Sequence, residues 1–455
     1  MLRDLITRLA GRSRPSEADR LLHAAHAARA SGDLDRAADL LARASAEQPA
    51  RVAPRCLLAE VYLARGDHLG AESLLREIIR VTPSEAQAHE LLGQALRRRG
   101  ATQEAAHAFH RAIELDWHGH SARSELAAAL TELGRPHEAI PLLRWVLKRV
   151  PDLADAHQNY GVALQETGRF DDALPRFERA AALEPGNIGH INHLAMCLRG
   201  LDRHTDAVRE LERALALAPE EPSTLTNLAL VLRELGRPEQ ARAALAPLVA
   251  RQPDYVPARC AMASVLQELG DYTGARAQYD HALDLAPGSG GVRLGRALLR
   301  LGQGDFAGGW DDYEGRLDSP ESPHRGFPFP DWPADALAGR AILVYAEQGL
   351  GDEIMFAGCL PDLIAESGRV VVECDPRLAS LFRRSFPGAS VQGAPRTWEH
   401  PWLAAAGAID AQAAAGSLPR RYRRDRASFP AHSGYLRPDP ARVSHYRTRL
   451  AALGR

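Results

Sequence analysis

The sequence predicts an α-solenoid of paired helices that is followed by an α/β domain. One observation is a pattern of glycine, alanine and proline that recurs every 34 residues through about two thirds of the chain. Another is a change near residue 339 to short apolar runs that alternate with helical patterns. A 34-residue period is typical of stacked helical units, and alternating strands and helices are typical of a doubly wound α/β domain.

The repeat is clearest at the predicted turn between the two helices of each unit. Its residues are Gly32, Gly66, Gly100, Gly134, Gly168, Asp202, Gly236, Gly270 and Gly304. A small residue follows five positions later, and proline usually closes the unit. We expect glycine to end the first helix, alanine to let the two helices approach closely, and proline to end the second helix. The pattern predicts nine units over residues 18–323, after a short amphipathic lead-in helix over residues 1–17.

These units resemble tetratricopeptide repeats, which carry small residues, glycine and proline at the same offsets. The clearest match includes Tyr160, Gly161, Phe177, Ala180 and Pro185. The resemblance implies a superhelix whose first helices line a concave groove for a protein or peptide partner. It specifies the fold more closely than the function, because such arrays bind many unrelated partners.

Three residues are candidates for that groove. Asn159 and Asn227 occupy the sixth position of their units, and His193 occupies this position in the unit between them. In repeats of the protein O-linked N-acetylglucosamine transferase type, asparagine at this position forms a ladder that grips peptide backbones, since an amide both donates and accepts hydrogen bonds. Other residues interrupt the ladder in the remaining units. Two interpretations stay open: peptide-backbone recognition, or solvated polar residues on an inner face.

The composition excludes several classes of function. The chain has 455 residues, 45% of them apolar, and its 56 basic residues are offset by 58 acidic ones, which argues against a nucleic-acid partner. Five widely spaced cysteines without a C-x-x-C pair favour a reducing cytoplasm over a disulfide framework or a zinc site. No apolar run is long enough for stable membrane insertion. The 18 histidines form no ligand set, so neither a metal nor a bound cofactor is expected.

The period changes after a connector rich in proline and aromatic residues at 324–338. Residues 339–455 are the predicted α/β domain, with strands at 342–345 and 370–373, helices at 352–366 and 376–386, and a third strand near 389–392. The run AILVYAEQGLGDEIMF at 341–356 combines a strand, a turn and a helix start. This layout holds anionic or sugar-phosphate ligands in α/β folds.

A second resemblance rests on this run together with residues on either side of it. Gly309-Trp310, Tyr313-Glu314 and Arg316 precede it, and Ser417-Leu418-Pro419 follows it. In this order they resemble the heptosyltransferase-like glycosyltransferase domains of GT-B type that are fused behind bacterial tetratricopeptide arrays. The resemblance implies a Rossmann-like domain that is the N-terminal half of a GT-B fold.

The same resemblance implies roles for the loop after the first strand. Asp352 is the candidate general base for an acceptor hydroxyl, and Glu347, Gln348, Gly349 and Gly351 are candidate substrate-binding residues. A nucleotide sugar would be the donor substrate, and no metal would be needed. Asp352 also suits the first turn of a helix, where an acid meets the helix dipole favourably, so both roles stay open. The basic run at 418–426 suits either a phosphate or solvent.

The expected function is a tetratricopeptide protein-interaction scaffold joined to a glycosyltransferase-like domain. That domain would transfer a sugar from a nucleotide donor to an acceptor, and we expect it to be incomplete in this chain, because no second strand, glycine-rich loop and helix series follows it. The alternative is a non-catalytic, protein-binding scaffold. Whether the chain is an enzyme therefore stays open.

Overall fold

A computed structural model describes residues 16–318, 326–332, 337–395, 400–431 and 434–453. It forms two compact units, Met1–Val231 and Leu232–Arg455, with the boundary inside helix α14 (Pro222–Glu234). We call them the N-terminal and C-terminal units. Most of the predicted lead-in helix lies outside the described residues. The predicted domain boundaries stay predictions, and they do not coincide with this division.

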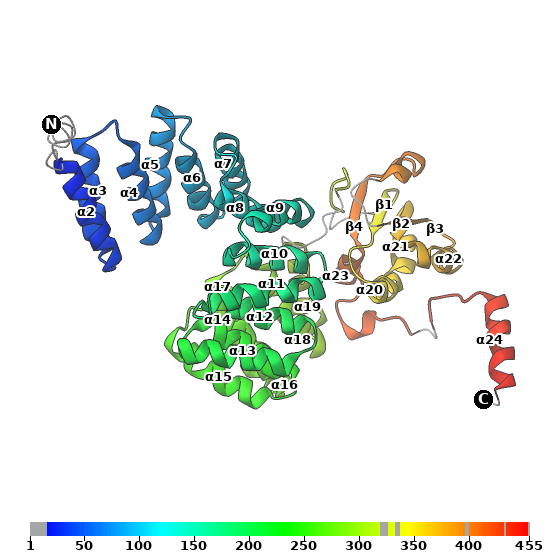
Figure 1. Ribbon diagram of the computed structural model, residues 1–455. Helices are drawn as coiled ribbons and strands as arrows, with labels where there is room; N and C mark the ends of the chain where they lie inside the picture. Colours follow the sequence, from blue (N-terminus) through cyan, green and yellow to red (C-terminus); the bar gives the residue numbers. More distant parts are fainter. Residues whose placement is uncertain (1–15, 319–325, 333–336, 396–399, 432–433, 454–455) are drawn as a thin grey trace, which may run out of the picture. The chain divides into compact units, whose positions relative to one another are not determined.

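The predicted helical solenoid is confirmed as consecutive helix pairs, α2/α3 to α18/α19 (Figure 1). Besides α14, the helices are α2 (Glu17–Ala30), α3 (Leu34–Glu47), α4 (Val52–Ala64), α5 (His68–Val81), α6 (Ala86–Arg98), α7 (Thr102–Leu115), α8 (His120–Glu132), α9 (Pro136–Arg149), α10 (Ala154–Glu166), α11 (Phe170–Leu183), α12 (Ile188–Gly200), α13 (His204–Leu217), α15 (Pro238–Arg251), α16 (Val256–Glu268), α17 (Tyr272–Leu285), α18 (Gly290–Gly302) and α19 (Phe306–Tyr313).

The turns inside the pairs have the backbone conformation that the sequence predicts. The eight turn glycines all have positive φ, from 70° at Gly236 to 82° at Gly304. Asp202, which replaces glycine in the sixth pair, adopts the same left-handed conformation with φ of 57°. Aspartate tolerates this region better than most residues because its short side chain can hydrogen-bond locally. The repeat therefore survives one substitution of its turn residue.

Small residues set how closely the two helices of a pair approach. In α10 and α11, the Phe177 ring lies beside Gly161, and a Cβ atom added there would meet that ring at 2.7 Å. Phe177 is fully buried between Ala173 and Ala180, which are also buried. The Phe109 ring approaches Gly93 in the same way in the third pair. The cores of these two pairs thus depend on a large ring seated against a residue without a side chain.

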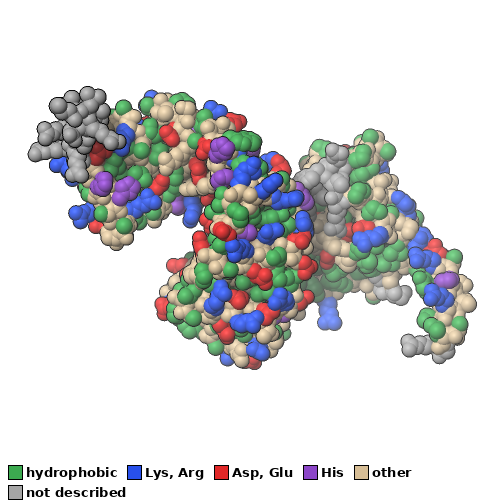
Figure 2. Space-filling view, viewed as in Figure 1, with side chains coloured by type: hydrophobic (Ala, Val, Ile, Leu, Met, Phe, Trp, Pro, Cys, Tyr) green, Lys and Arg blue, Asp and Glu red, His purple; other side chains and the backbone are tan. Residues whose placement is uncertain are grey.

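Charged side chains of both signs are interspersed over the visible surface (Figure 2). Many form ion pairs between neighbouring helices, such as Arg29 with Glu60 at 2.7 Å and Arg76 with Glu104 at 3.1 Å. Such exposed pairs contribute little to stability individually. No helix that the structure describes has both the length and the apolar character needed to cross a bilayer.

The C-terminal unit also contains a four-stranded parallel sheet with strand order β3-β2-β1-β4. The strands are β1 (Ala341–Tyr345), β2 (Arg369–Cys374), β3 (Ala389–Gly393) and β4 (Ala411–Ala414). The remaining helices are α20 (Leu350–Phe356), α21 (Leu360–Glu366), α22 (Pro376–Ser385), α23 (Leu418–Tyr422), α24 (Pro440–Ala452) and the 3-10 helices η1 (Glu314–Asp318), η2 (Ala357–Cys359), η3 (Pro401–Ala405), η4 (Ala415–Ser417) and η5 (Arg426–Ser428).

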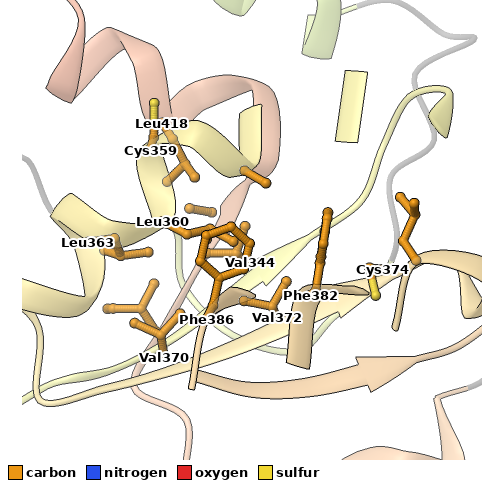
Figure 3. Packing of buried hydrophobic residues seen from close by; sticks show 14 of the residues in the cluster. Val344, Cys359, Leu360, Leu363, Val370, Val372, Cys374, Phe382, Phe386 and Leu418 are labelled. Atoms are coloured by element: carbon orange, nitrogen blue, oxygen red, sulfur yellow. The ribbon is translucent and has the colours of Figure 1, made fainter. Parts of the chain in front are cut away.

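The two faces of this sheet are covered differently. On one face, Val344, Val370 and Val372 pack against Phe382 and Leu363 from the helices (Figure 3). On the other face, Leu343 and Val371 pack against Phe327 of the connector, with Trp402 of η3 beside them. The crossover from β3 to β4 therefore covers the second face with a 3-10 helix, where the doubly wound prediction implies an α-helix.

Two further details differ from the sequence-based expectations. The single helix expected at 352–366 is divided into α20, η2 and α21, because Pro361 removes a backbone donor and Gly358 weakens the helix at the junction. The strand β4 was not predicted, because its four residues, AQAA, lack the β-branched and aromatic side chains of the other strands.

The contact between Phe177 and Gly161 can be tested by filling the space at the glycine. Gly161→Val should lower the free energy of unfolding of the array by about 2 kcal/mol, because the new side chain must displace a fully buried ring. Urea denaturation followed by circular dichroism measures this change. Gly186→Val is the matched control, since a Cβ at Gly186 meets nothing within 4 Å. Equal stability of the two variants would contradict the packing account.

Candidate functional site

The first helices of successive pairs contact one another in the N-terminal unit: α4 with α6, α6 with α8, α8 with α10, and α10 with α12. We call the surface they share the inner face. A hollow of about 340 Å³ lies on it, between Leu63 of α4, Gln94 and Arg97 of α6, and Glu125 of α8. The inner face is therefore recessed between α4, α6 and α8.

The three predicted groove residues lie at equivalent positions on successive first helices. Asn159 is half-buried on α10, and its Nδ2 donates to the Ser124 side chain at 3.0 Å. His193 is half-buried on α12 and stacks on Phe177, with ring centroids 5.8 Å apart. Burial lowers the pKa of the His193 imidazole, and nearby His190 lowers it further. Asn227 is half-buried on α14.

Sequence reasoning missed a set of polar contacts that join neighbouring first helices. Gln158 contacts His190, and Asn192 Nδ2 donates to Thr224 Oγ1 at 2.9 Å. Their sequence separations of 32 residues are close to one repeat. The sequence does carry a signal for these contacts, namely polar residues that are separated by about one 34-residue period. Such residues face each other across adjacent units.

An apolar row accompanies the predicted groove residues. Val162, Met196 and Leu230 follow Asn159, His193 and Asn227 by three residues, and all three are half-buried. Residues three apart lie on one face of a helix. The first helices α10, α12 and α14 therefore each present one polar and one apolar side chain in the same arrangement.

In the C-terminal unit, the loop after β1 is held by a buried ion pair. Glu347 Oε1 accepts hydrogen bonds from Arg316 Nη2 at 2.7 Å and from the Gly416 backbone N–H at 2.8 Å. The side chains of Arg316 and Glu347 are 5% and 3% exposed. Burial would lower the pKa of Arg316, but Glu347 and Glu314 raise it above its ordinary value. Glu347 was predicted to bind substrate, and its Oε1 is engaged by the protein itself.

The network extends to both neighbouring segments. Arg316 also donates to Glu314 Oε1 and to Ser417 Oγ, each at 2.9 Å, and Ser417 in turn donates to Glu314. Its members come from η1, the β1–α20 loop and η4, which are up to about 100 residues apart in sequence. The structure thus brings together residues from all three segments on which the second resemblance rests.

Gln348 joins the same group of residues through Tyr313. The Tyr313 hydroxyl donates to Gln348 Oε1 at 2.9 Å. Burial raises the pKa of this hydroxyl, whereas the hydrogen bond to Gln348 lowers it. The carboxylates of Glu347 and Asp352 raise it as well.

Asp352 lies in the first turn of α20 and caps it. Its Oδ2 accepts a hydrogen bond from the Gly349 backbone N–H at 3.1 Å. Gly349 and Gly351 are exposed, and a Cβ added at Gly351 would meet nothing within 4 Å. The capping role is therefore present, and Gly351 is exposed in the first turn of the same helix.

Four arginines of the predicted basic run, Arg420, Arg421, Arg423 and Arg424, are paired with acidic residues. Arg424 and Arg420 contact Asp311 of α19 at 2.9 and 3.0 Å, and Arg423 contacts Asp362 at 2.7 Å. The first five residues of this run form α23. Through the ion pairs with Asp311, the run attaches the α/β elements to α19 within the C-terminal unit. Among the described residues, no group of three or more His, Cys, Asp or Glu side chains is arranged to hold a metal ion.

Comparisons with known proteins identify the repeats. A family profile described as Tetratricopeptide repeat matches residues 28–95 and 198–263, and a second with the same description matches residues 125–188, 163–222 and 260–315. These matches fall on the helix pairs. The helical array is therefore made of tetratricopeptide repeats, the class of scaffold that binds peptides and proteins.

Individual relatives match parts of the chain. Protein FlbA of Caulobacter vibrioides is 34% identical over 145 residues, which make up 30% of this chain and 24% of FlbA, so the chain matches about a quarter of that curated relative. The structure of a tetratricopeptide repeat protein from Parabacteroides merdae aligns with this chain at a TM-score of 0.41 and 15% sequence identity. The alignment covers 63% of this chain and 99% of that protein's chain. The structure of YrrB, a TPR protein with an unusual peptide-binding site, aligns with this chain at a TM-score of 0.32 and 19% sequence identity. The alignment covers 41% of this chain and 97% of the YrrB chain.

The buried pair of Arg316 and Glu347 can be tested by removing the carboxylate. Glu347→Ala should destabilise the sheet by about 3 kcal/mol, because the buried guanidinium loses its main partner and the Gly416 N–H loses its acceptor. Hydrogen exchange of the β1 and β4 amides measures this loss.

The matched control is Arg377→Ala. It removes an exposed ion pair with Asp375, and its arginine side chain is 72% exposed, so no measurable change is expected. If the exchange rates in Glu347→Ala equal those of this control, the network does not hold the loop.

Proposed function

We propose that the inner face of the repeats binds an extended peptide. The observation that carries this proposal is the matched arrangement on α10, α12 and α14, where a polar side chain and an apolar side chain recur together. Amide side chains suit peptide N–H and C=O groups because they donate and accept. The apolar row suits the alternate side chains of an extended peptide, which point to one side at regular spacing.

The polar positions differ in how they would contribute. Asn159 already donates to Ser124, so its amide oxygen is the group that would accept from a peptide N–H. His193 is held against Phe177, and its lowered pKa favours a neutral ring at neutral pH, which is a partner for an uncharged peptide group. The preferred partner is accordingly a peptide with apolar side chains and few charges in its central segment.

A charge introduced into the apolar row tests this proposal. The ligands are peptides selected against the full chain from a random-peptide display library. Met196→Glu should weaken their binding about tenfold or more, as measured by fluorescence anisotropy, because the carboxylate must be desolvated against the peptide. Leu217→Glu is the matched control, since Leu217 is an apolar residue that is 53% exposed on a second helix, α13. Similar affinities for the two variants would place the peptide elsewhere.

We propose as a second function that the α/β elements take part in glycosyl transfer from a nucleotide sugar. One specific observation favours it. The strand order β3-β2-β1-β4 has the arrangement of the first four strands of a dinucleotide-type sheet, in which ligands bind beyond the carboxyl ends of the strands where the order reverses. That position lies between β1 and β4. It is flanked by Gly349, by the first turn of α20 with Gly351 and Asp352, and by η4.

Asp352 remains the candidate general base in this proposal. Its Oδ2 caps α20, and a carboxylate has two oxygens, so capping and proton transfer are compatible. Glu347 and Gln348 would position the loop through Arg316 and Tyr313. The open surface at Gly351 is where the acceptor would approach. The alternative, a scaffold without catalysis, retains the same network as a purely structural one.

Asp352→Asn separates these alternatives. The amide oxygen can still accept from the Gly349 N–H, so the cap is preserved while the basic group is lost. Turnover of a mixture of UDP-, GDP-, ADP- and CMP-sugars, followed by mass spectrometry with the full-length protein, should fall by about 100-fold or more. Unchanged turnover in the variant would remove the base role, and absence of turnover in the wild type would favour the scaffold.

A further inference from the structure

Two tryptophans of the N-terminal unit depart from the repeat pattern at its surface. Trp117, in the turn between α7 and α8, stands where Pro83 and Pro151 close the neighbouring units, and it is 64% exposed. Trp145, on α9, is half-buried, and the equivalent positions one repeat before and after it carry exposed arginines. The repeat therefore does not require an aromatic ring at either position. Exposed tryptophan is typical of binding surfaces.

A buried arginine holds the two rings together. The Arg123 guanidinium of α8 lies over both, with Cζ 4.6 Å from the Trp117 ring centroid and 4.0 Å from that of Trp145. The two rings meet edge-on, with centroids 6.2 Å apart. The Cζ atom of Arg149 lies 3.7 Å from the Trp145 centroid as well. These cation–π contacts fix both rings in position.

The charge of Arg123 has no carboxylate beside it. Arg123 is 3% exposed and forms no ion pair with a described residue, and its Nη1 donates to the Gly119 carbonyl at 3.1 Å. Burial lowers the pKa of this guanidinium and nearby Arg149 lowers it further, whereas Asp116 raises it. Because Arg123 is buried, its charge would attract an anionic partner through the rings, without direct contact.

Three exposed cations continue this positive charge along α9. Arg144 and Lys148 lie one turn apart, and Lys148 and Arg149 follow Trp145 by three and four residues, so they are neighbours on the helix surface. None of the three forms an ion pair with a described residue, unlike the paired arginines of other repeat helices. These two turns of α9 contain no acid. We call Trp117, Trp145 and the three cations the basic aromatic surface.

We propose that the basic aromatic surface binds an acidic peptide segment that carries an aromatic side chain between its carboxylates. Charge complementarity favours this partner, because guanidinium and ammonium groups bind carboxylates through charge-assisted hydrogen bonds. The exposed ring of Trp117 offers a stacking partner to the aromatic side chain. Trp145 and Arg123 hold that ring in place.

Two features favour a peptide over a single-stranded nucleic acid, which also combines negative charge with aromatic groups. Exposed acids in the adjoining turns, Asp116 and Asp152, limit the length of the positive surface. The 58 acidic residues of the chain slightly outnumber its 56 basic ones, so no wider field attracts a polyanion. A short segment with a few carboxylates meets neither obstacle.

This inference is independent of the proposed inner-face function. The exposed cations of the basic aromatic surface lie on a second helix, α9, whereas the inner face is formed by first helices. The peptide proposed for the inner face carries few charges, so the two partners differ in chemistry. The tests of the two proposals can therefore fail separately.

Three labelled probes, added to the full chain, test the chemistry of the partner. They are the N-acetylated peptide GDEFEDG, its amide analogue GNQFQNG, and a single-stranded oligothymidine of matched charge. Fluorescence anisotropy at low ionic strength should give GDEFEDG a Kd of about 100 μM or tighter, and GNQFQNG a Kd at least about tenfold weaker. No binding of GDEFEDG, equal affinity for GNQFQNG, or tighter binding of the oligothymidine would overturn the proposal.

Charge reversal on α9 tests the location. Arg144→Glu combined with Lys148→Glu should weaken GDEFEDG binding about tenfold or more, because two attractions become repulsions. The matched control is Arg80→Glu combined with Arg242→Glu, which changes the net charge equally. These two arginines are exposed on α5 and α15 and form no ion pair with a described residue. Equal weakening in both variants would mean a general charge effect and would overturn the site.

Lys148 is the only lysine in the chain, so the bound peptide can be located chemically. A carbodiimide condenses a carboxylate with an amine to an amide and takes up the water as a urea. With GDEFEDG bound, coupling should occur mainly at Lys148, as identified by mass spectrometry of the digested protein. Coupling mainly at the N-terminal amine of the chain would contradict the proposed location.

Trp117→Ala tests the stacking, together with a second peptide, GDEAEDG, in which alanine replaces the aromatic residue. The substitution should weaken GDEFEDG about 3- to 10-fold and leave the affinity for GDEAEDG nearly unchanged, because only the first peptide has a ring to stack. Comparing the two peptides cancels any change in the surrounding charges. An equal effect on both would show that Trp117 does not contact the aromatic side chain.

Discussion

Each helix pair of this protein has an apolar face that it cannot bury by itself, and this requirement organises the rest of the structure. Within a pair, a ring such as Phe177 sits against Gly161, so the two helices approach closely. Between pairs, residues such as Leu164 and Ile191 are buried only because neighbouring helices pack against them. Stability therefore builds up from contacts between neighbours, as in other repeat proteins. The last pair has no further repeat to cover it.

The α/β elements supply that missing cover in the C-terminal unit. Trp310 and Tyr313 of α19 are buried together with Phe356 of α20. Hydrogen bonds from Arg316 to Glu347 join η1 to the β1–α20 loop beside this apolar contact. The β1–α20 loop is therefore built partly by the repeats, and its conformation depends on residues outside the α/β fold.

The two proposed functions lie in different units. The polar and apolar rows on α10, α12 and α14 belong to the N-terminal unit and suit a peptide. The segment from Glu347 to Asp352 belongs to the C-terminal unit, where η1 and α19 contact it through Arg316 and Tyr313. The proposed scaffold function and the proposed sugar transfer therefore rest on different residues.

The sequence by itself determined the repeat array, because a 34-residue period places glycine, alanine and aromatic residues at positions where only paired helices satisfy them. It also predicted the strands β1 and β2, whose branched side chains are buried on both faces of the sheet. The period also places Asn159, His193 and Asn227 on equivalent helices, and their role in a groove stays a prediction. Tertiary structure decided what the sequence could not specify: the short strand β4, the covering of the second sheet face by Phe327 and Trp402, and the engagement of Glu347 by Arg316. These depend on contacts between residues that are distant in the chain and follow no period, so only the folded arrangement fixes which partners meet.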